Sequence, residues 1–185
     1  KYPRLINKLN LDEIKFNSEL GKLVKIISFM LKGRIDEVNK FIEILSEIND
    51  PDEILNMTTK RGNEIYQKYD RINKIYLNLL NDSLNSATKD KLLLHIYNPS
   101  SITFNEELAN ELIYKFPKKI VIVGREKDGM MRLSLRSRKL VLPKIIDKSL
   151  KGLNGMGGGH EHACGVKVSK EDFPEFIERI KKIIL

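Results

Sequence analysis

The spacing of hydrophobic residues changes near residue 88, and this change limits the folds that the chain can adopt. Before residue 88, apolar residues recur every three or four positions, as they do along one side of an α-helix. After residue 88, short apolar or alternating runs typical of β-strands are separated by helical segments. We therefore predict a helical connecting region over residues 1–87 and an α/β (α+β) domain over residues 88–185.

Three apolar stripes mark the helices predicted in the first region, over about 20–31, 38–48 and 63–84. Asp50-Pro51-Asp52 interrupts them, and Pro51 suits the first position of a new helix. Helices with one apolar side usually bury that side. We expect the stripes to form a core, and the alternative is that they include a binding surface for a partner protein.

The second region alternates strands and helices. Asp128-Gly129 predicts a hairpin turn, and Ser169 is expected to cap the last helix, which should run to Leu185. The predicted strands cover residues 92–97, 119–124, 131–136 and about 163–168. The predicted helices cover residues 105–115, 143–150 and the segment after Ser169.

Positive charge is concentrated in the middle of this region. Residues 115–151 hold twelve basic and three acidic side chains, a net charge of +9, whereas the whole chain carries +8. Such an excess attracts the phosphates of an extended nucleic acid, although a solvated basic surface is the alternative. The side chains that we predict to form a nucleic-acid surface are Arg132, Arg138, Lys139 and Lys144.

A glycine-rich segment, Gly157-Gly158-Gly159-His160, follows the basic region. Three glycines in a row contribute no side chains to a core, but they let backbone N–H groups approach an anion closely. We predict an anion-binding loop in which His160 donates a hydrogen bond to phosphate. The alternative is a tight turn with a structural histidine.

Two further residues could assist this loop. Ser134 and Arg136 share one side of a predicted strand, and a guanidinium group there suits phosphate binding. A metal site is not expected, because His160 and His162 have no supporting cluster of ligands. The single cysteine, Cys164, excludes an internal disulfide and fits a reducing compartment.

Targeting signals are not evident in the sequence. Its amino end has no apolar segment of the signal-peptide type, and no apolar run approaches the roughly 18 residues of a membrane helix. We therefore expect a cytoplasmic protein with no membrane partner.

Taken together, Ser134-Leu135-Arg136-Ser137 and the later Gly157-Gly158-Gly159-His160-Glu161-His162-Ala163-Cys164-Gly165 resemble the DHHA1 domain. This domain is the substrate-binding part of DHH phosphoesterases, which include RecJ-type single-strand exonucleases. The resemblance covers residues 88–185 and implies a mixed sheet of about four to five strands flanked by helices. The helical region is similar in character to the connecting helices of archaeal RecJ-like proteins, which would make this chain the C-terminal part of such an exonuclease.

The resemblance also implies roles for individual residues. His160 would contact the substrate phosphate and assist catalysis only together with a metal-binding DHH domain. The remaining residues expected to bind substrate are Ser134, Arg136, Gly157, Gly158 and Gly159. The family's Asp-His-His motif, which binds two Mn²⁺ (or Mg²⁺) ions, does not occur in this sequence. We therefore expect no cofactor in this chain, and no hydrolysis by the chain alone.

The expected partners are single-stranded DNA or RNA and the chain's own DHH domain. Two alternatives remain from the sequence. The chain could be a tRNA-binding module like the C-terminal domain of alanyl-tRNA synthetases, although His160 argues against this because that version generally lacks the histidine. It could also be an inactive scaffold for replication or tRNA-modification proteins.

Overall fold

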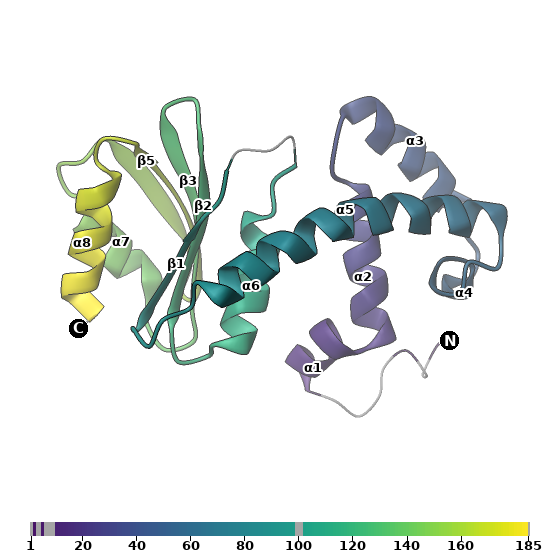
Figure 1. Ribbon diagram of the computed structural model, residues 1–185, viewed down its shortest axis with the longest axis horizontal. Helices are drawn as coiled ribbons and strands as arrows, with labels where there is room; N and C mark the ends of the chain where they lie inside the picture. Colours follow the sequence, from purple (N-terminus) through teal and green to yellow (C-terminus); the bar gives the residue numbers. More distant parts are fainter. Residues whose placement is uncertain (1, 3–4, 6–9, 99–101, 185) are drawn as a thin grey trace. The chain divides into compact units, whose positions relative to one another are not determined.

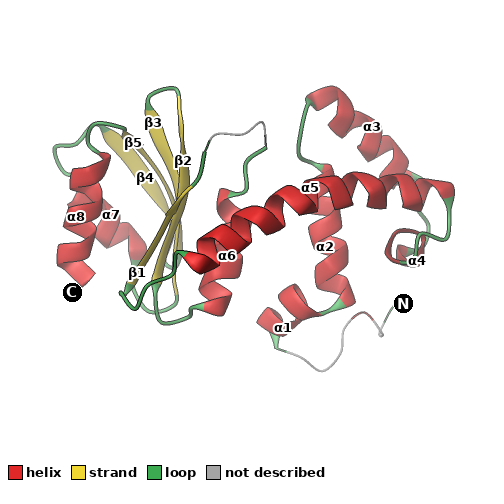
Figure 2. Cartoon of the chain, in the orientation of Figure 1, coloured by secondary structure: helices red, strands yellow, loops and turns green. Residues whose placement is uncertain are grey.

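The computed structural model describes residues 2, 5, 10–98 and 102–184. The chain divides into two compact units, Lys1–Asn78 and Leu79–Leu185. The described residues of the first unit are helical, and those of the second form a sheet with helices (Figure 1, Figure 2). This mixed α/β fold is the predicted fold class. No helix in the described part of the chain is long and apolar enough to cross a membrane.

Helices make up the first unit, and polar side chains fix where several of them begin. Asn10, Ser18 and Asp50 each accept a hydrogen bond from a backbone N–H in the first turn of the following helix. Pro51 occupies the first turn of its helix, as predicted. The helices are α1 (Leu11–Asn17), α2 (Glu19–Met30), α3 (Ile35–Ser46), α4 (Pro51–Leu55) and α5 (Lys60–Asn85), of which α5 continues into the second unit.

Helix α2 buries only part of the predicted stripe, in which Met30 is fully buried. Phe29 is fully buried, and its ring centroid lies 5.8 Å from that of Tyr69 and 5.4 Å from that of Tyr76, both on α5. This packing turns other apolar residues of α2 outward, so three members of the predicted stripe are exposed by 37–55% of their surface: Val24, Ile27 and Leu31. Apolar residues on more than one side of α2 made its buried side ambiguous from spacing alone.

The second unit contains a five-stranded sheet in the order β1-β2-β3-β5-β4. β1 and β2 are parallel, and the other neighbouring pairs are antiparallel. Asp128 and Gly129 have φ angles of +55° and +70°, which confirms the predicted hairpin between β2 and β3. The strands are β1 (Leu92–Ile96), β2 (Ile120–Lys127), β3 (Met130–Ser137), β4 (Gly155–His160) and β5 (Ala163–Ser169).

Helices cover the two faces of the sheet unequally. α6 (Asn105–Lys115) packs on β2 and β3 from one face, whereas α7 (Leu142–Leu150) and α8 (Phe173–Ile184) cover the opposite face (Figure 1). The main core lies between the sheet and the latter two helices. The first face is therefore open over β5 and β4, where His160, Gly165 and Lys167 are exposed.

The end of the chain differs in one detail from its prediction. Ser169 belongs to β5 instead of capping the last helix, and its hydroxyl accepts a hydrogen bond from the N–H of Asp172. The helix begins at Phe173, because the turn between Ser169 and Asp172 has to reverse the chain first. Leu185 lies outside the described residues.

Candidate nucleic-acid interface

Strand register brings the two main predicted phosphate ligands onto one face of the sheet. Arg136 of β3 pairs with Ala163 of β5, which pairs with His160 of β4. Residues paired across strands project to the same face, so the Arg136 and His160 side chains flank the small Ala163 side chain. Two strand spacings put their Cα atoms about 10 Å apart. We call these three residues the Arg136 row.

Helix α6 holds Arg136 in place. The Arg136 Nε donates to Asn110 Oδ1 at 2.7 Å, and Nη1 donates to the carbonyl oxygen of Leu135 at 2.9 Å. Partial burial lowers the pKa of Arg136, while the nearby Glu106 carboxylate opposes that shift. The group stays a cation at neutral pH because the ordinary pKa of arginine is so high. Neither of these hydrogen bonds uses the Nη2 atom.

His160 is exposed at the end of β4, and its backbone is tied to β5. The Cys164 thiol donates to the His160 carbonyl oxygen at 3.2 Å. Burial raises the pKa of Cys164, so the thiol remains protonated and can keep donating this hydrogen bond. Cys164 is therefore a packing and positioning residue, and the His160 imidazole faces solvent.

The glycine segment is an edge strand and not the predicted loop, because every residue from Gly155 to His160 pairs with β5. Packing requires glycine at two of these positions, which the spacing of residues in the sequence did not indicate. A Cβ atom on Gly157 would lie 2.7 Å from Val166 Cγ2, and one on Gly159, whose φ is +146°, would lie 2.5 Å from the Ala163 oxygen. Only Gly158 opens onto free space, with nothing within 4 Å of an added Cβ.

Gly158 belongs to a second set of paired residues, Ser134–Gly165–Gly158, which we call the glycine row. Ser134 is buried beneath α6. Gly165 and Gly158 contribute no side chains, so bare backbone forms the open face beside the Arg136 row. A strip of this kind allows a flat or extended ligand to approach the sheet closely.

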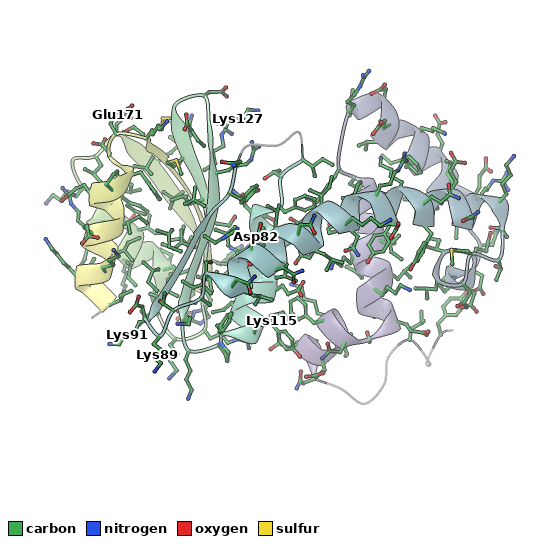
Figure 3. The ribbon with its side chains drawn as sticks, viewed as in Figure 1. Asp82, Lys89, Lys91, Lys115, Lys127 and Glu171 are labelled. Carbon is green, nitrogen blue, oxygen red and sulfur yellow. The ribbon has the colours of Figure 1, made fainter. Side chains whose placement is uncertain are left out.

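The four predicted surface cations do not form one patch. Arg132 lies on the same face as Arg136, two pairs further along β3. Arg138 and Lys139 follow the end of β3, next to the turn at Glu161 and His162. Lys144 lies on α7, which covers the opposite face, so the structure separates it from the candidate interface. Lys127, which is not one of these four residues, lies at the end of β2 next to the hairpin turn that leads into β3 (Figure 3).

The candidate interface does not fit a catalytic metal pair. No group of three or more His, Cys, Asp and Glu side chains converges among the described residues. The His162 ring nitrogen Nδ1 lies 3.3 Å from the Leu140 carbonyl oxygen, away from the Arg136 row. The donor set of this face, guanidinium, imidazole and amide, suits an anion instead.

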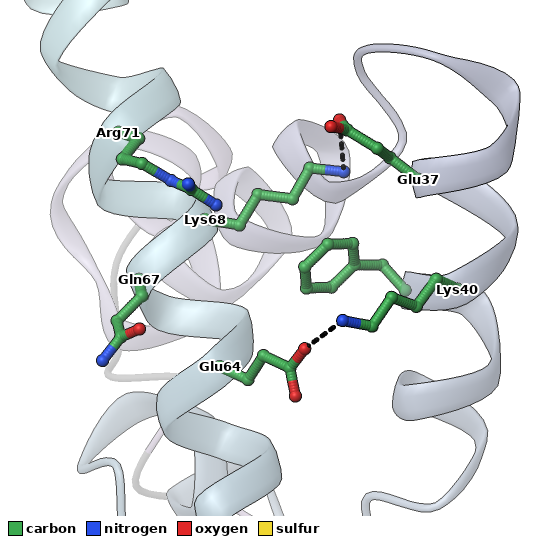
Figure 4. Close-up of a pocket in the computed structure, with 7 residues that line it drawn as sticks. Glu37, Lys40, Glu64, Gln67, Lys68 and Arg71 are labelled. Atoms are coloured by element: carbon green, nitrogen blue, oxygen red, sulfur yellow. Dashed lines mark hydrogen bonds and ion pairs between the residues drawn. The ribbon is translucent and has the colours of Figure 1, made fainter.

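A pocket in the helical unit holds a buried lysine but offers little free binding capacity (Figure 4). The Lys68 ammonium lies 4.2 Å from the Phe41 ring centroid, donates to the Met30 carbonyl oxygen at 3.3 Å, and lies 3.9 Å from Glu37. Burial lowers the pKa of Lys68, and Glu37 opposes the shift. These contacts explain the buried lysine as part of the helix packing.

Comparisons with known proteins bear on the family and the fold of the chain. Residues 105–185 match the DHHA1 domain family. RecJ of Thermus thermophilus, solved in complex with Mg²⁺, superposes with a TM-score of 0.65 at 17% identity, over 92% of this chain and 25% of that chain. The pGpG-specific phosphodiesterase PggH of Vibrio cholerae superposes with a TM-score of 0.63 at 15% identity, over 96% of this chain and 61% of that chain.

A third structure, CDC45 of Entamoeba histolytica, superposes with a TM-score of 0.51 at 10% identity, over 91% of this chain and 38% of that chain. No curated protein matches the chain in sequence. The chain thus spans a quarter of the RecJ chain and about three fifths of the PggH chain. At these identities the superpositions establish a shared fold, and the residues that match the DHHA1 family lie within the sheet unit.

Proposed function

We propose that the open sheet face binds the phosphate backbone of single-stranded nucleic acid and serves as the substrate-holding part of a RecJ-like DHH phosphoesterase. The observation that carries this proposal is the Arg136 row, in which a fixed guanidinium and an exposed imidazole flank a small side chain. Both groups donate hydrogen bonds to phosphate oxygens. The neighbouring glycine row leaves room for the sugar.

The relatives support the same chemistry. One similar structure carries the name of the exonuclease RecJ, and another is called a pGpG-specific phosphodiesterase. Proteins with these names act on nucleotide strands, which matches a face that can hold phosphate next to bare backbone. The DHH domain of such an enzyme would supply Mn²⁺ or Mg²⁺, and with it the activation of water. The residues of this chain would hold and orient the strand.

Binding measurements on four proteins test the proposal. Fluorescence anisotropy with a labelled single-stranded DNA and its RNA counterpart should show salt-sensitive binding by the wild-type chain. Arg136→Ala and His160→Ala should each weaken binding about tenfold, because each removes a hydrogen bond to a charged phosphate. Lys182→Ala is the control, since this exposed residue of α8 lies on the opposite face.

Two outcomes would contradict the proposal. The first is that the wild-type chain does not bind either strand at low salt. The second is that all three variants lose the same affinity, which would mean that binding reflects only the overall positive charge of the protein. A folded tRNA belongs in the same experiment as a competitor. If it binds much more tightly than either single strand, the chain is a tRNA-binding module instead.

A further inference from the structure

A second set of cations crosses the same open face. Arg125 of β2 pairs with Arg132 of β3, which pairs with Lys167 of β5, and Lys167 pairs with Met156 of β4. Three positive side chains therefore project side by side from three adjacent strands. We call these four residues the Arg132 row. It lies beyond the glycine row, on the side away from Arg136.

Among the described residues, no acidic side chain pairs with these three cations. Like charges placed directly opposite each other destabilise a sheet. In the part of the chain that the structure describes, none of the three cations forms an ion pair, whereas Glu126 pairs with Lys170 at 2.8 Å instead. The Arg125 Nε atom is buried without a hydrogen-bond partner among the described residues. A bound anion on the open face would relieve the repulsion among the three cations.

The spacing of the two cationic rows defines the size of the ligand. Arg132 and Arg136 are four residues apart on β3, which corresponds to about 13 Å along the strand. One phosphate group is too small to contact both rows, but two phosphates of one strand can. Asn105 at the start of α6 donates to the Arg132 carbonyl oxygen at 2.8 Å, so α6 fixes both arginine positions.

We propose that the Arg132 row is a second phosphate site, so that the face takes a linear oligonucleotide with at least three phosphates. The strand would run parallel to β5, with one phosphate at the Arg136 row, the next phosphate and its flanking sugars over the glycine row, and the third phosphate at Arg132 and Lys167. Met156, the last residue of the Arg132 row, is exposed by 70% and offers an apolar surface against which a base can pack. This inference rests on the proposed function, because it extends the same binding face.

A comparison of ligand lengths tests it directly. The two probes are thymidine 5′-monophosphate, with one phosphate, and 5′-phosphorylated trithymidylate, with three. We expect the wild-type chain to bind the longer probe at least about tenfold more tightly, since each phosphate contact is a charge-assisted hydrogen bond. The double variant Arg132→Ala/Lys167→Ala should lose that gain while keeping the affinity for the monophosphate.

The salt dependence gives an independent readout. Each neutralised phosphate of a single strand contributes about 0.7 to the slope of log affinity against log salt, so the double variant should lower the slope for trithymidylate by about that amount. The charge-matched control is Lys89→Ala/Lys182→Ala, which removes two exposed lysines outside both rows. The control should keep the length gain.

The outcomes separate this inference from the proposed function. If the wild-type chain binds neither probe, both proposals fail. If it binds both probes equally, or if the Arg132→Ala/Lys167→Ala variant keeps the gain, only the second site fails. Because the Arg132→Ala/Lys167→Ala variant removes like charges that repel each other, its melting temperature should be higher than that of the wild-type chain. A lower melting temperature would contradict repulsion within the Arg132 row.

Discussion

The three consecutive glycines of β4 meet different surroundings, although they look equivalent in the sequence. Gly157 faces Ile146 of α7 and Val166 of β5, where an added Cβ would lie 2.9 and 2.7 Å from their methyl groups. Gly158 faces open space on the other side of the sheet. Packing therefore requires the first glycine, and access to the sheet surface accounts for the second.

Alanine at these two positions should have opposite effects. Gly157→Ala overpacks the contact with α7 and should lower the stability of the sheet unit by about 1–3 kcal/mol. Gly158→Ala should leave stability unchanged or raise it by about 0.5–1 kcal/mol, because glycine is costly within a strand. Urea denaturation together with hydrogen exchange of the β5 amides measures both effects in the sheet unit.

The same two substitutions separate an effect on stability from an effect on ligand binding. Gly158→Ala places a methyl group on the glycine row, so it should weaken oligonucleotide binding in a stable protein. A destabilised Gly158→Ala variant, or a Gly157→Ala variant as stable as the wild type, would mean that the two glycines have been assigned to the wrong faces.

Single residues also show what the sequence could and could not predict at the interface. Arg136, Ser134 and Arg132 share one face because strand alternation requires it, and that part was predictable. Lys167 could have been found in the same way, since it alternates with the buried Val166 and Val168. Asn110 could not, because its contact with Arg136 depends on where α6 crosses the sheet.

At the scale of single elements, β1 carries a buried histidine with consequences for stability. His95 is only 8% exposed, its Nε2 has no hydrogen-bond partner among the described residues, and its ring stacks on Tyr97 at 6.3 Å. Burial lowers the pKa of His95 below its usual value, and Asp82 opposes this shift. Protonation of His95 therefore costs more free energy in the folded state than in the unfolded state.

This difference in the pKa of His95 makes the free energy of unfolding depend on pH. The unfolded chain takes up the His95 proton first as the pH falls, so the stabilising contribution is complete above about pH 6.5 and declines below it. One proton limits the change to about 1.4 kcal/mol per pH unit. His95→Phe, which cannot titrate, should lose less stability than the wild type between pH 7.5 and pH 5 in urea denaturation. Parallel losses in both proteins would contradict this role of His95.

The glycine-rich element shows why one prediction failed. Glycine runs usually indicate loops, since glycine weakens strands and supplies little surface to pack. Here β5 provides pairing along the whole of β4, and α7 lies close enough to exclude side chains at Gly157. Tertiary contacts of this kind override local preference, and they are invisible in the spacing of residues. The neighbouring hairpin at Asp128-Gly129 was predictable because its turn geometry is encoded locally.

At the scale of the whole chain, the change of hydrophobic pattern near residue 88 correctly indicated helices followed by an α/β sheet with helices. The compact units divide at Asn78 and Leu79, within α5. A long continuous helix has no sequence signal where its packing environment changes, so this point could not be read from periodicity. The sheet order was not predicted either, because pairing between distant strands depends on contacts across the whole unit.

The central claim is that the open face over β5 and β4 contacts nucleic acid. Nuclear magnetic resonance tests it most directly, because the backbone amides of β4 and β5 report on each row of this face. Titration of the full chain with a short single-stranded oligonucleotide should shift the amide signals of Gly158, His160, Gly165 and Lys167 progressively. The signals of exposed positions on α7 and α8, such as Lys148 and Lys182, should stay unchanged. Shifts confined to α7 and α8, or no shifts on β4 and β5 at saturating ligand, would contradict the claim.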